Sequence, residues 1–157
     1  MKYISIFLFS LVILFSCNND SKIYSKYKDL SKGGVWDKED EIFFKVQVKD
    51  ISSTYNVKFL FRHLSEFAYK DLNIKVTETS PSKRESVSEY SLNLVDDNGD
   101  YIGEEMMSVI DCETVVESNK QYTEKGVYIY KVEHVMSVSS IGNAIELGLV
   151  VEKNSEK

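Results

Sequence analysis

The sequence predicts an all-β protein, an antiparallel β-sandwich of the immunoglobulin-like or jelly-roll-like kind that follows an N-terminal signal peptide. Apolar and polar residues alternate in six or seven short runs, and turn residues separate these runs. No segment keeps a convincing helical period across three turns. The composition of the 157 residues, 43% hydrophobic and 28% charged, is that of one ordinary globular domain.

Each predicted strand has one apolar face and one more polar face. Every second residue from Tyr55 to Phe61 is apolar, which is the pattern of a strand with one face in the core and one in water. The same alternation predicts further strands over residues 41–50, 72–79, 90–94, 127–136 and 145–151. Residues 104–120 fit this pattern least, and a short helix or an irregular excursion is expected there.

A hairpin turn is predicted where Asp96-Asp97 leads into Asn98-Gly99. Asn-Gly is the strongest short hairpin signal, because both residues tolerate the positive φ angles of a type I′ turn. The chain would then return through Tyr101 and Ile102.

The first sixteen residues have the features of a secretory signal. Lys2 supplies a short positive region, and residues 3–15 (YISIFLFSLVILF) form an apolar run broken only by two serines. A membrane-spanning helix needs about 20 apolar residues, so this run is too short to be a permanent span.

The residues that end this signal, Leu14-Phe15-Ser16-Cys17, resemble the lipobox of bacterial lipoproteins. The resemblance implies removal of residues 1–16, a diacylglyceryl thioether on Cys17, and acylation of the new amino group, with palmitate expected. Several acyl chains make such an anchor stable. The alternative is an ordinary secreted protein that is cleaved nearby and keeps Cys17 as a free thiol.

The predicted domain boundaries follow from these signals. Residues 17–33 are expected to form a lipidated polar tether, residues 34–153 the β-sandwich, and residues 154–157 a C-terminal tail. Besides Cys17 the chain has only Cys112, so lipidation of Cys17 leaves no intramolecular disulfide. The domain must then be stabilised by packing alone.

The charge balance excludes some classes of partner. Lys2 is the only charged residue of the signal, which leaves 18 basic against 25 acidic residues in the rest of the chain. An acidic domain without a basic stripe is a poor candidate for binding nucleic acid, and it is not attracted to an anionic membrane.

No catalytic or metal site is predicted. His63, His134 and Cys112 have no ligand-like spacing and no glycine-flanked elbow, so both histidines are expected to be structural. The residues Asp96, Asp97, Asn98 and Asp100 resemble a calcium loop, but Tyr101 occupies the sixth position, where an EF-hand needs glycine. Adjacent Glu104 and Glu105 are interpreted as solvent-facing charges. We therefore expect no enzyme and no cofactor.

The aromatic content leaves a second interpretation open. Ten tyrosines and eight phenylalanines accompany Trp36, more than a small core must use. Core packing explains most of them, but some could form an aromatic sheet surface that binds a glycan or a peptide.

An ordered set of short motifs resembles the gliding-motility lipoprotein GldH family of Bacteroidetes. The motifs are Tyr24 and Tyr27, Gly34-Val35-Trp36, Ser53-Thr54-Tyr55-Asn56-Val57, LVDDNGDYIG (94–103), Gly126-Val127-Tyr128, VEHVM (132–136) and ELGLVVEK (146–153). The resemblance covers about residues 17–153, with departures such as Arg62-His63 where the family tends to have Arg-Asn.

The resemblance implies a lipid-anchored, non-enzymatic component of the gliding-motility machinery and its associated protein secretion. Its expected partners are other gliding and secretion proteins of the envelope, together with the membrane that holds the anchor. The expected location is the cell envelope, either the outer membrane or the periplasmic face of the inner membrane.

Overall fold

A computed structural model describes residues 21–30 and 33–154 of the chain. The predicted signal peptide and Cys17 lie outside the described residues. Within the described ranges, no helix is long and apolar enough to cross a membrane.

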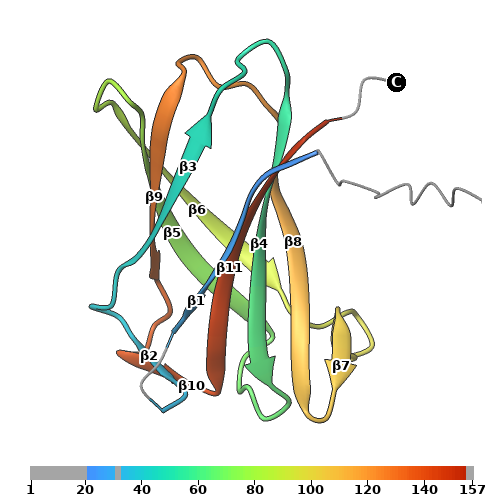
Figure 1. The fold of residues 1–157 in the computed structure, drawn as a ribbon. Coiled ribbons are helices and arrows are strands. Elements are labelled where there is room, and N and C mark those ends of the chain that lie inside the picture. Colours follow the sequence, from blue (N-terminus) through green and yellow to red (C-terminus); the bar gives the residue numbers. More distant parts are fainter. Residues whose placement is uncertain (1–20, 31–32, 155–157) are drawn as a thin grey trace, which may run out of the picture.

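The described residues form eleven β-strands and no helix (Figure 1). The strands are β1 (Lys22–Asp29), β2 (Val35–Asp37), β3 (Ile42–Val48), β4 (Tyr55–Leu64), β5 (Asp71–Thr79), β6 (Glu85–Asn93), β7 (Glu104–Met106), β8 (Val109–Lys120), β9 (Gly126–His134), β10 (Ser140–Gly142) and β11 (Ala144–Lys153). This confirms the predicted all-β class.

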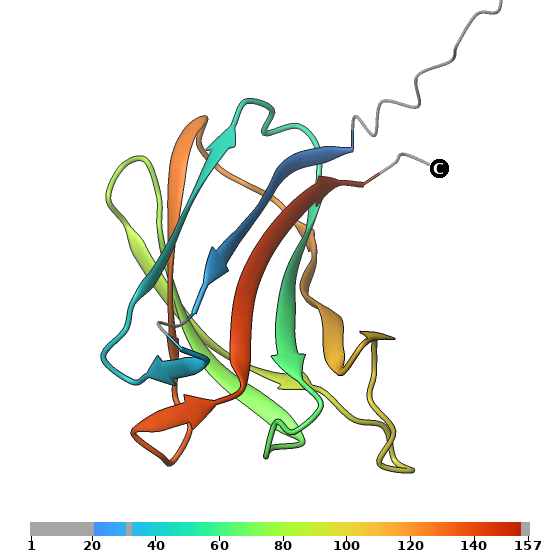
Figure 2. The same ribbon diagram turned by 60° about the horizontal axis from the view of Figure 1, so that its bottom comes forward.

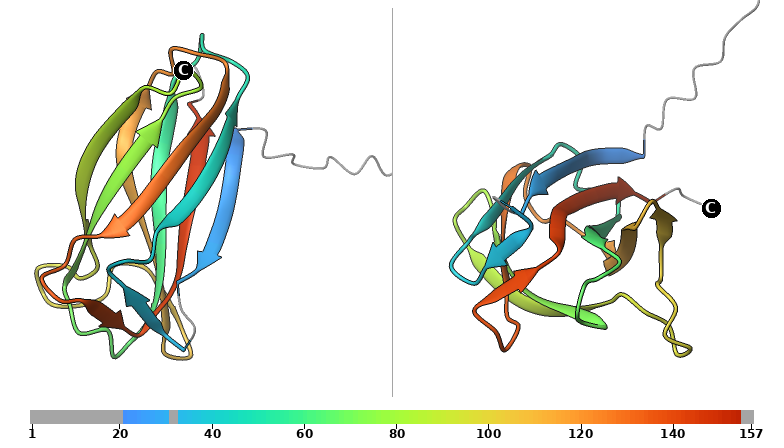
Figure 3. Two further views of the ribbon diagram at one scale, coloured as in Figure 1. Left: turned by 90° about the vertical axis from the view of Figure 1, so that its left-hand side faces the viewer. Right: turned by 90° about the horizontal axis from the view of Figure 1, so that it is seen from below.

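Two antiparallel sheets pack face to face, as the two views in Figure 3 show. One has the order β1-β11-β4-β8-β7 and the other the order β3-β9-β5-β6, while β2 and β10 form a small separate ribbon. Among the eight long strands the pairs are nested: β1 with β11, β3 with β9, β4 with β8, and β5 with β6. Nested pairing of this kind is one long hairpin rolled up, so of the two predicted architectures the sandwich is a jelly roll.

The core is formed by the alternating positions that the sequence pattern predicted. Tyr55, Val57, Phe59 and Phe61 of β4 are all buried, and the intervening residues are more exposed. The same holds for the buried Tyr128, Tyr130, Val132 and His134 of β9. The ribbon adds fully buried Trp36 to this core.

The sandwich begins earlier in the chain than we predicted. Residues 22–29, assigned to the tether, form β1 and pair with residues 146–152 of β11. Ile23 and Tyr24 pack against the core, and the Tyr24 ring meets Phe44 edge-on at 6.5 Å between centroids. These apolar contacts with β3 hold the segment as an edge strand of the sandwich, so residues 22–29 are not part of a tether.

The expectation of a helix or irregular excursion over residues 104–120 was wrong. This stretch contains the β7–β8 hairpin and the 12-residue strand β8. Register shifts at the β4 positions Tyr55, Val57 and Lys58 interrupt the alternation of β8, which explains why no strand period is visible there.

The predicted hairpin exists, but its turn differs from the predicted type I′. The Gly99 N–H donates to the Asp96 carbonyl, and Gly99 alone has a positive φ, +90°, while Asn98 does not. The geometry is a type I turn followed by a left-handed glycine. The two-residue turn with positive φ at both positions is instead Met107-Ser108, at 48° and 67°.

This difference predicts unequal effects of two neighbouring substitutions. Gly99→Val should lower the free energy of unfolding by about 1–2 kcal/mol, because a β-branched residue resists the left-handed region. Asn98→Val should cost less, since it removes only a 3.3 Å side-chain bond to Asp96. Urea unfolding of both variants tests this, and equal losses would contradict the assigned turn.

Candidate functional site

The two ends of the sandwich differ in what they present. We call the end where β1 begins at Lys22 and β11 ends at Lys153 the proximal end, and the opposite end the distal end. Both termini of the described domain therefore lie together at the proximal end (Figure 2). At the distal end the β7–β8 hairpin turns at Met107-Ser108, beside the end of β4 at Leu64. The ten-residue strands β4 and β11 separate these ends by about 33 Å.

The structure brings Cys112 next to His63, not next to His134. His63 Nδ1 donates to the Leu64 carbonyl at 2.8 Å, so Nε2 can accept from the Cys112 thiol at 3.7 Å. Burial raises the pKa of Cys112 to about 11 and lowers the pKa of His63. A nucleophilic thiolate–imidazolium pair requires shifts in the opposite directions, so this contact is a structural one.

His134 is buried at the end of β9, with its ring edge-on to Trp36 at 5.3 Å between centroids. Neither ring nitrogen has a hydrogen-bond partner of normal geometry among the described residues. Burial lowers the pKa of His134, and the positive charge of Lys38 lowers it further. The ring is therefore a neutral part of the core at pH 7.

The acidic candidates lie apart from any metal-binding arrangement. The Asp96 carboxylate accepts the backbone N–H groups of Asn98 and Asp100 at 2.8 and 3.0 Å, which completes the turn. Glu104 and Glu105 are consecutive in β7 and exposed, so their side chains point to opposite faces. In the described part of the chain, no group of three or more His, Cys, Asp or Glu side chains is placed to hold a metal.

Most of the aromatic residues belong to the core and not to a binding surface. Of the large aromatic side chains in the described ranges, only Tyr27 and Phe43 are exposed. Tyr27 pairs with Gly148 on the outer face of the five-stranded sheet, whereas Phe43 lies on the outer face of the other sheet. These two rings cannot form one aromatic platform.

Tyr27 lies flat on the outer face because Gly148 leaves room for it. A Cβ at Gly148 would lie 2.7 Å from Tyr27 Cδ1. Beside this ring, the Arg62 guanidinium binds both Asp111 carboxylate oxygens, at 2.6 and 2.8 Å, and Glu146 at 2.7 Å. These ion pairs cross three strands and cover the outer face with satisfied charges.

A polar cluster lies between the sheets at the side where β6 faces β8. Lys120 Nζ is 2.8 Å from Glu78 Oε2 and 2.8 Å from Glu117 Oε2. The Tyr90 hydroxyl donates to Glu117 Oε1 at 2.9 Å, which links the two sheets. Burial acts to lower the pKa of Lys120, but its bonds to Glu117 and Glu78 outweigh burial and raise it. The sequence patterns did not predict this cluster, since Glu78 and Tyr90 lie far along the chain from the β8 residues that they contact.

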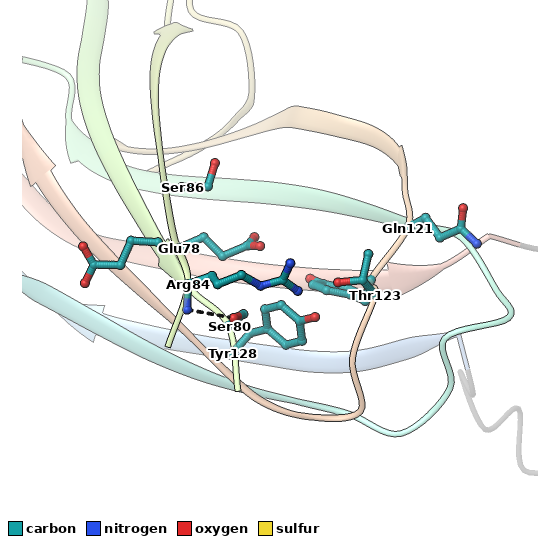
Figure 4. A pocket seen from close by; sticks show the side chains of 9 residues that line it. Glu78, Ser80, Arg84, Ser86, Gln121, Thr123 and Tyr128 are labelled. Atoms are coloured by element: carbon teal, nitrogen blue, oxygen red, sulfur yellow. Dashed lines mark hydrogen bonds between the residues drawn. The ribbon is translucent and has the colours of Figure 1, made fainter. Parts of the chain in front are cut away.

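Next to the cluster, at the proximal end, is a pocket of about 240 Å³ (Figure 4). It lies between the β5–β6 hairpin and the β8–β9 connection, and its lining includes Glu78, Ser80, Arg84 and Thr123. Arg84 is already paired with Glu124, and Ser82 also binds Glu124. Small-molecule pockets usually exceed about 300 Å³ and are mostly apolar, which this one is not.

Among the described residues, the most exposed large apolar side chains lie at the distal end. Met107 is 90% exposed and Met106 is 72% exposed, at the tip of the β7–β8 hairpin. Our sequence analysis did not single out these residues. The sequence signal that could have identified them is two adjacent methionines directly after a segment rich in acidic residues.

The inter-sheet cluster predicts a large effect of Lys120→Met. Removing the ammonium leaves Glu78 and Glu117 without their counter-ion, so the free energy of unfolding should fall by about 3 kcal/mol. The matched control adds Glu78→Gln and Glu117→Gln to Lys120→Met, which removes the uncompensated charges. Denaturant unfolding should place this triple variant above the single one; the reverse order would refute the charge argument.

The buried histidines predict acid sensitivity. Their folded-state pKa values lie below the ordinary 6.5, so below that pH the unfolded chain binds more protons than the folded one. The free energy of unfolding should therefore decrease as the pH falls from 7 to 5. His134→Leu should weaken this dependence without loss of a hydrogen bond of normal geometry, and an unchanged pH profile would show that His134 does not titrate on unfolding.

Two solved structures resemble this chain weakly. A search of curated proteins finds no significant match. A solved structure described as TmCBM61 in complex with beta-1,4-galactotriose is 13% identical, with a TM-score of 0.33, covering 87% of this chain and 92% of that chain. A structure of the infectious bursal disease virus Gx strain is 11% identical, with a TM-score of 0.32, covering 87% and 31%. At these TM-scores neither similarity bears on function.

The family comparison covers most of the chain. The family model described as GldH lipoprotein matches residues 22–151, from the first residue of β1 almost to the end of β11. The match therefore includes both sheets of the jelly roll and confirms the resemblance found in the sequence motifs. The chain belongs to the GldH lipoprotein family, which makes it a membrane-anchored protein of the cell envelope related to gliding motility.

Proposed function

We propose that this chain is a lipid-anchored, non-enzymatic component of the gliding-motility machinery and its associated protein secretion, and that it acts through protein contacts. The anchor is the lipidated Cys17, in the outer membrane or on the periplasmic face of the inner membrane. Membership of the GldH lipoprotein family supports the anchoring and the link to gliding.

The observation that carries this proposal is the short connection between Cys17 and the sandwich. β1 begins at Lys22 and is paired from its first residue with Glu152 of β11. The four peptide steps from Cys17 to Ser21 span at most about 14 Å even when fully extended. A lipid on Cys17 would therefore hold the proximal end of the domain close to the bilayer surface.

This placement determines which surfaces remain available to other proteins. The proximal loops at residues 49–54, 80–84 and 121–125 would face the membrane, and the distal end would project about 33 Å from it. The distal end carries the exposed Met106 and Met107, whereas the outer sheet faces carry exposed apolar residues singly. Exposed apolar groups that a monomer does not need favour contact with proteins over catalysis.

The anchor is tested by Cys17→Ser in the full-length chain. We expect loss of acyl labelling and movement of the protein from the membrane fraction to the soluble fraction, because one unmodified serine has no acyl chain to insert. Continued labelling of the variant would refute the proposed lipidation site. The thermal unfolding midpoint of the domain should stay unchanged, since Cys17 precedes the sandwich.

The importance of the short connection is tested by inserting about twelve Gly and Ser residues between Asp20 and Ser21. This insertion keeps Cys17 and its lipid but frees the domain from the bilayer surface. Crosslinking and affinity purification from native envelopes should then recover fewer gliding or secretion proteins than with the natural spacing. If recovery does not change, the proposed fixed height above the membrane is wrong.

A further inference from the structure

The β7–β8 hairpin at the distal end carries an apolar tip that the fold does not use. We call Met106 and Met107 the methionine knob. They are 72% and 90% exposed, so their side chains contribute almost nothing to the core. Met136, by contrast, is 7% exposed and packs inside the sandwich.

The backbone beneath the knob is unfavourable for the residues that occupy it. Met107 and Ser108 have φ values of 48° and 67°, and the hairpin closes with Met106 opposite Val109. Asn-Gly is preferred at these two positions, because residues with a Cβ are strained in the left-handed region. The chain thus keeps a long apolar side chain at a position where folding alone would favour asparagine or glycine.

The knob is also held firmly in place. The Ser65 N–H donates to the Ser108 carbonyl at 2.9 Å, and the Tyr101 hydroxyl donates to the Ser65 carbonyl. Gly103 lets β7 approach β8 closely, since a Cβ there would overlap the Asp111 carbonyl oxygen. A rigid, convex apolar tip loses little conformational entropy on entering a matching cavity.

The chain that leads into the knob is strongly acidic. Residues 96–108 contain five acidic residues and no basic residue: Asp96, Asp97, Asp100, Glu104 and Glu105. Asp96 is used by its turn, but the other four form no ion pair within the described residues. All five are exposed, and Glu104 and Glu105 stand in β7 directly before the knob; we call this set the acidic rim.

We infer that the methionine knob inserts into an apolar pocket of a partner protein whose rim carries lysine or arginine residues. A convex tip requires a concave receptor, and the acidic rim requires opposite charge on the other side. A second copy of this chain docked knob to knob would oppose one acidic rim with another, and an anionic lipid surface would repel the rim. The inference rests on the proposed function only in assuming that the chain acts through protein contacts.

Site-specific photo-crosslinking tests the occupant of the knob. A photoreactive residue replaces Met107 in the full-length chain in native envelopes, and the control places it at Val87, which is 59% exposed on β6. We expect a discrete protein adduct at 107 only, joined to an apolar segment flanked by basic residues. Its yield should fall several-fold between 50 and 500 mM salt, because the rim charges are screened. No adduct, a lipid adduct, a self-adduct or a salt-independent adduct would each overturn the inference.

A double substitution separates docking from folding. Met107→Asn with Ser108→Gly removes half of the knob and installs the preferred type I′ residues, so the melting temperature should rise by about 3 °C. The adduct formed from a photoreactive residue at Glu105 should nevertheless drop at least tenfold. A more stable protein with undiminished crosslinking would show that the knob makes no contact.

The two proposals fail in different ways. If Cys17→Ser releases the protein from the membrane but no adduct forms at position 107, the anchor stands and the docking inference is wrong. If Cys17→Ser stays labelled while the adduct at 107 persists, the proposed anchor is wrong and the docking contact stands.

Discussion

The pairing of β1 with β11 is the contact on which the rest of the arrangement depends. It joins residues 22–29 to residues 146–152, the outermost of the four nested pairs of the jelly roll. Because it fastens the start of the described domain to its end, it gathers both termini at the proximal end. It also turns residues 22–29 of the predicted tether into a strand. An anchor on Cys17 would for this reason orient the domain, whereas a flexible tether would not.

The two open sides of the sandwich are closed by different chemistry. Between β1 and β3 the closure is apolar and aromatic, through Tyr24 against Phe44. Between β6 and β8 it is ionic, through Lys120 between two carboxylates and the Tyr90–Glu117 hydrogen bond. The ionic side stabilises only as a complete set, since a single missing partner leaves a poorly solvated charge. This ionic side therefore contributes more to the alignment of the two sheets than to the free energy of unfolding.

At the distal end, by contrast, the residues do not suit the backbone that they occupy. Met107 and Ser108 have positive φ angles that residues with a Cβ rarely adopt, and the side chains of Met106 and Met107 are exposed to solvent next to carboxylates without an ion pair among the described residues. Disagreements between sequence and structure at several levels are expected where function, and not folding, selects the residues. The buried His134, which has no hydrogen-bond partner of normal geometry in the described ranges, is a second such disagreement, but it lies inside the core and presents nothing to a partner.

The sequence by itself determined the all-β class, most inward-facing positions and the family, because strand alternation and ordered motifs are local; the signal and its cysteine stay predictions. It did not determine β1, whose residues are polar enough to resemble a tether, or β8, whose register shifts hide its period. Only the tertiary structure decided that Cys112 meets His63, that Lys120 bridges Glu78 and Glu117, and that the methionines stand at a distal tip. Cys112 meets His63 from 49 positions away and Lys120 meets Glu78 from 42 positions away (120 − 78), and no local pattern records which distant strands will pair.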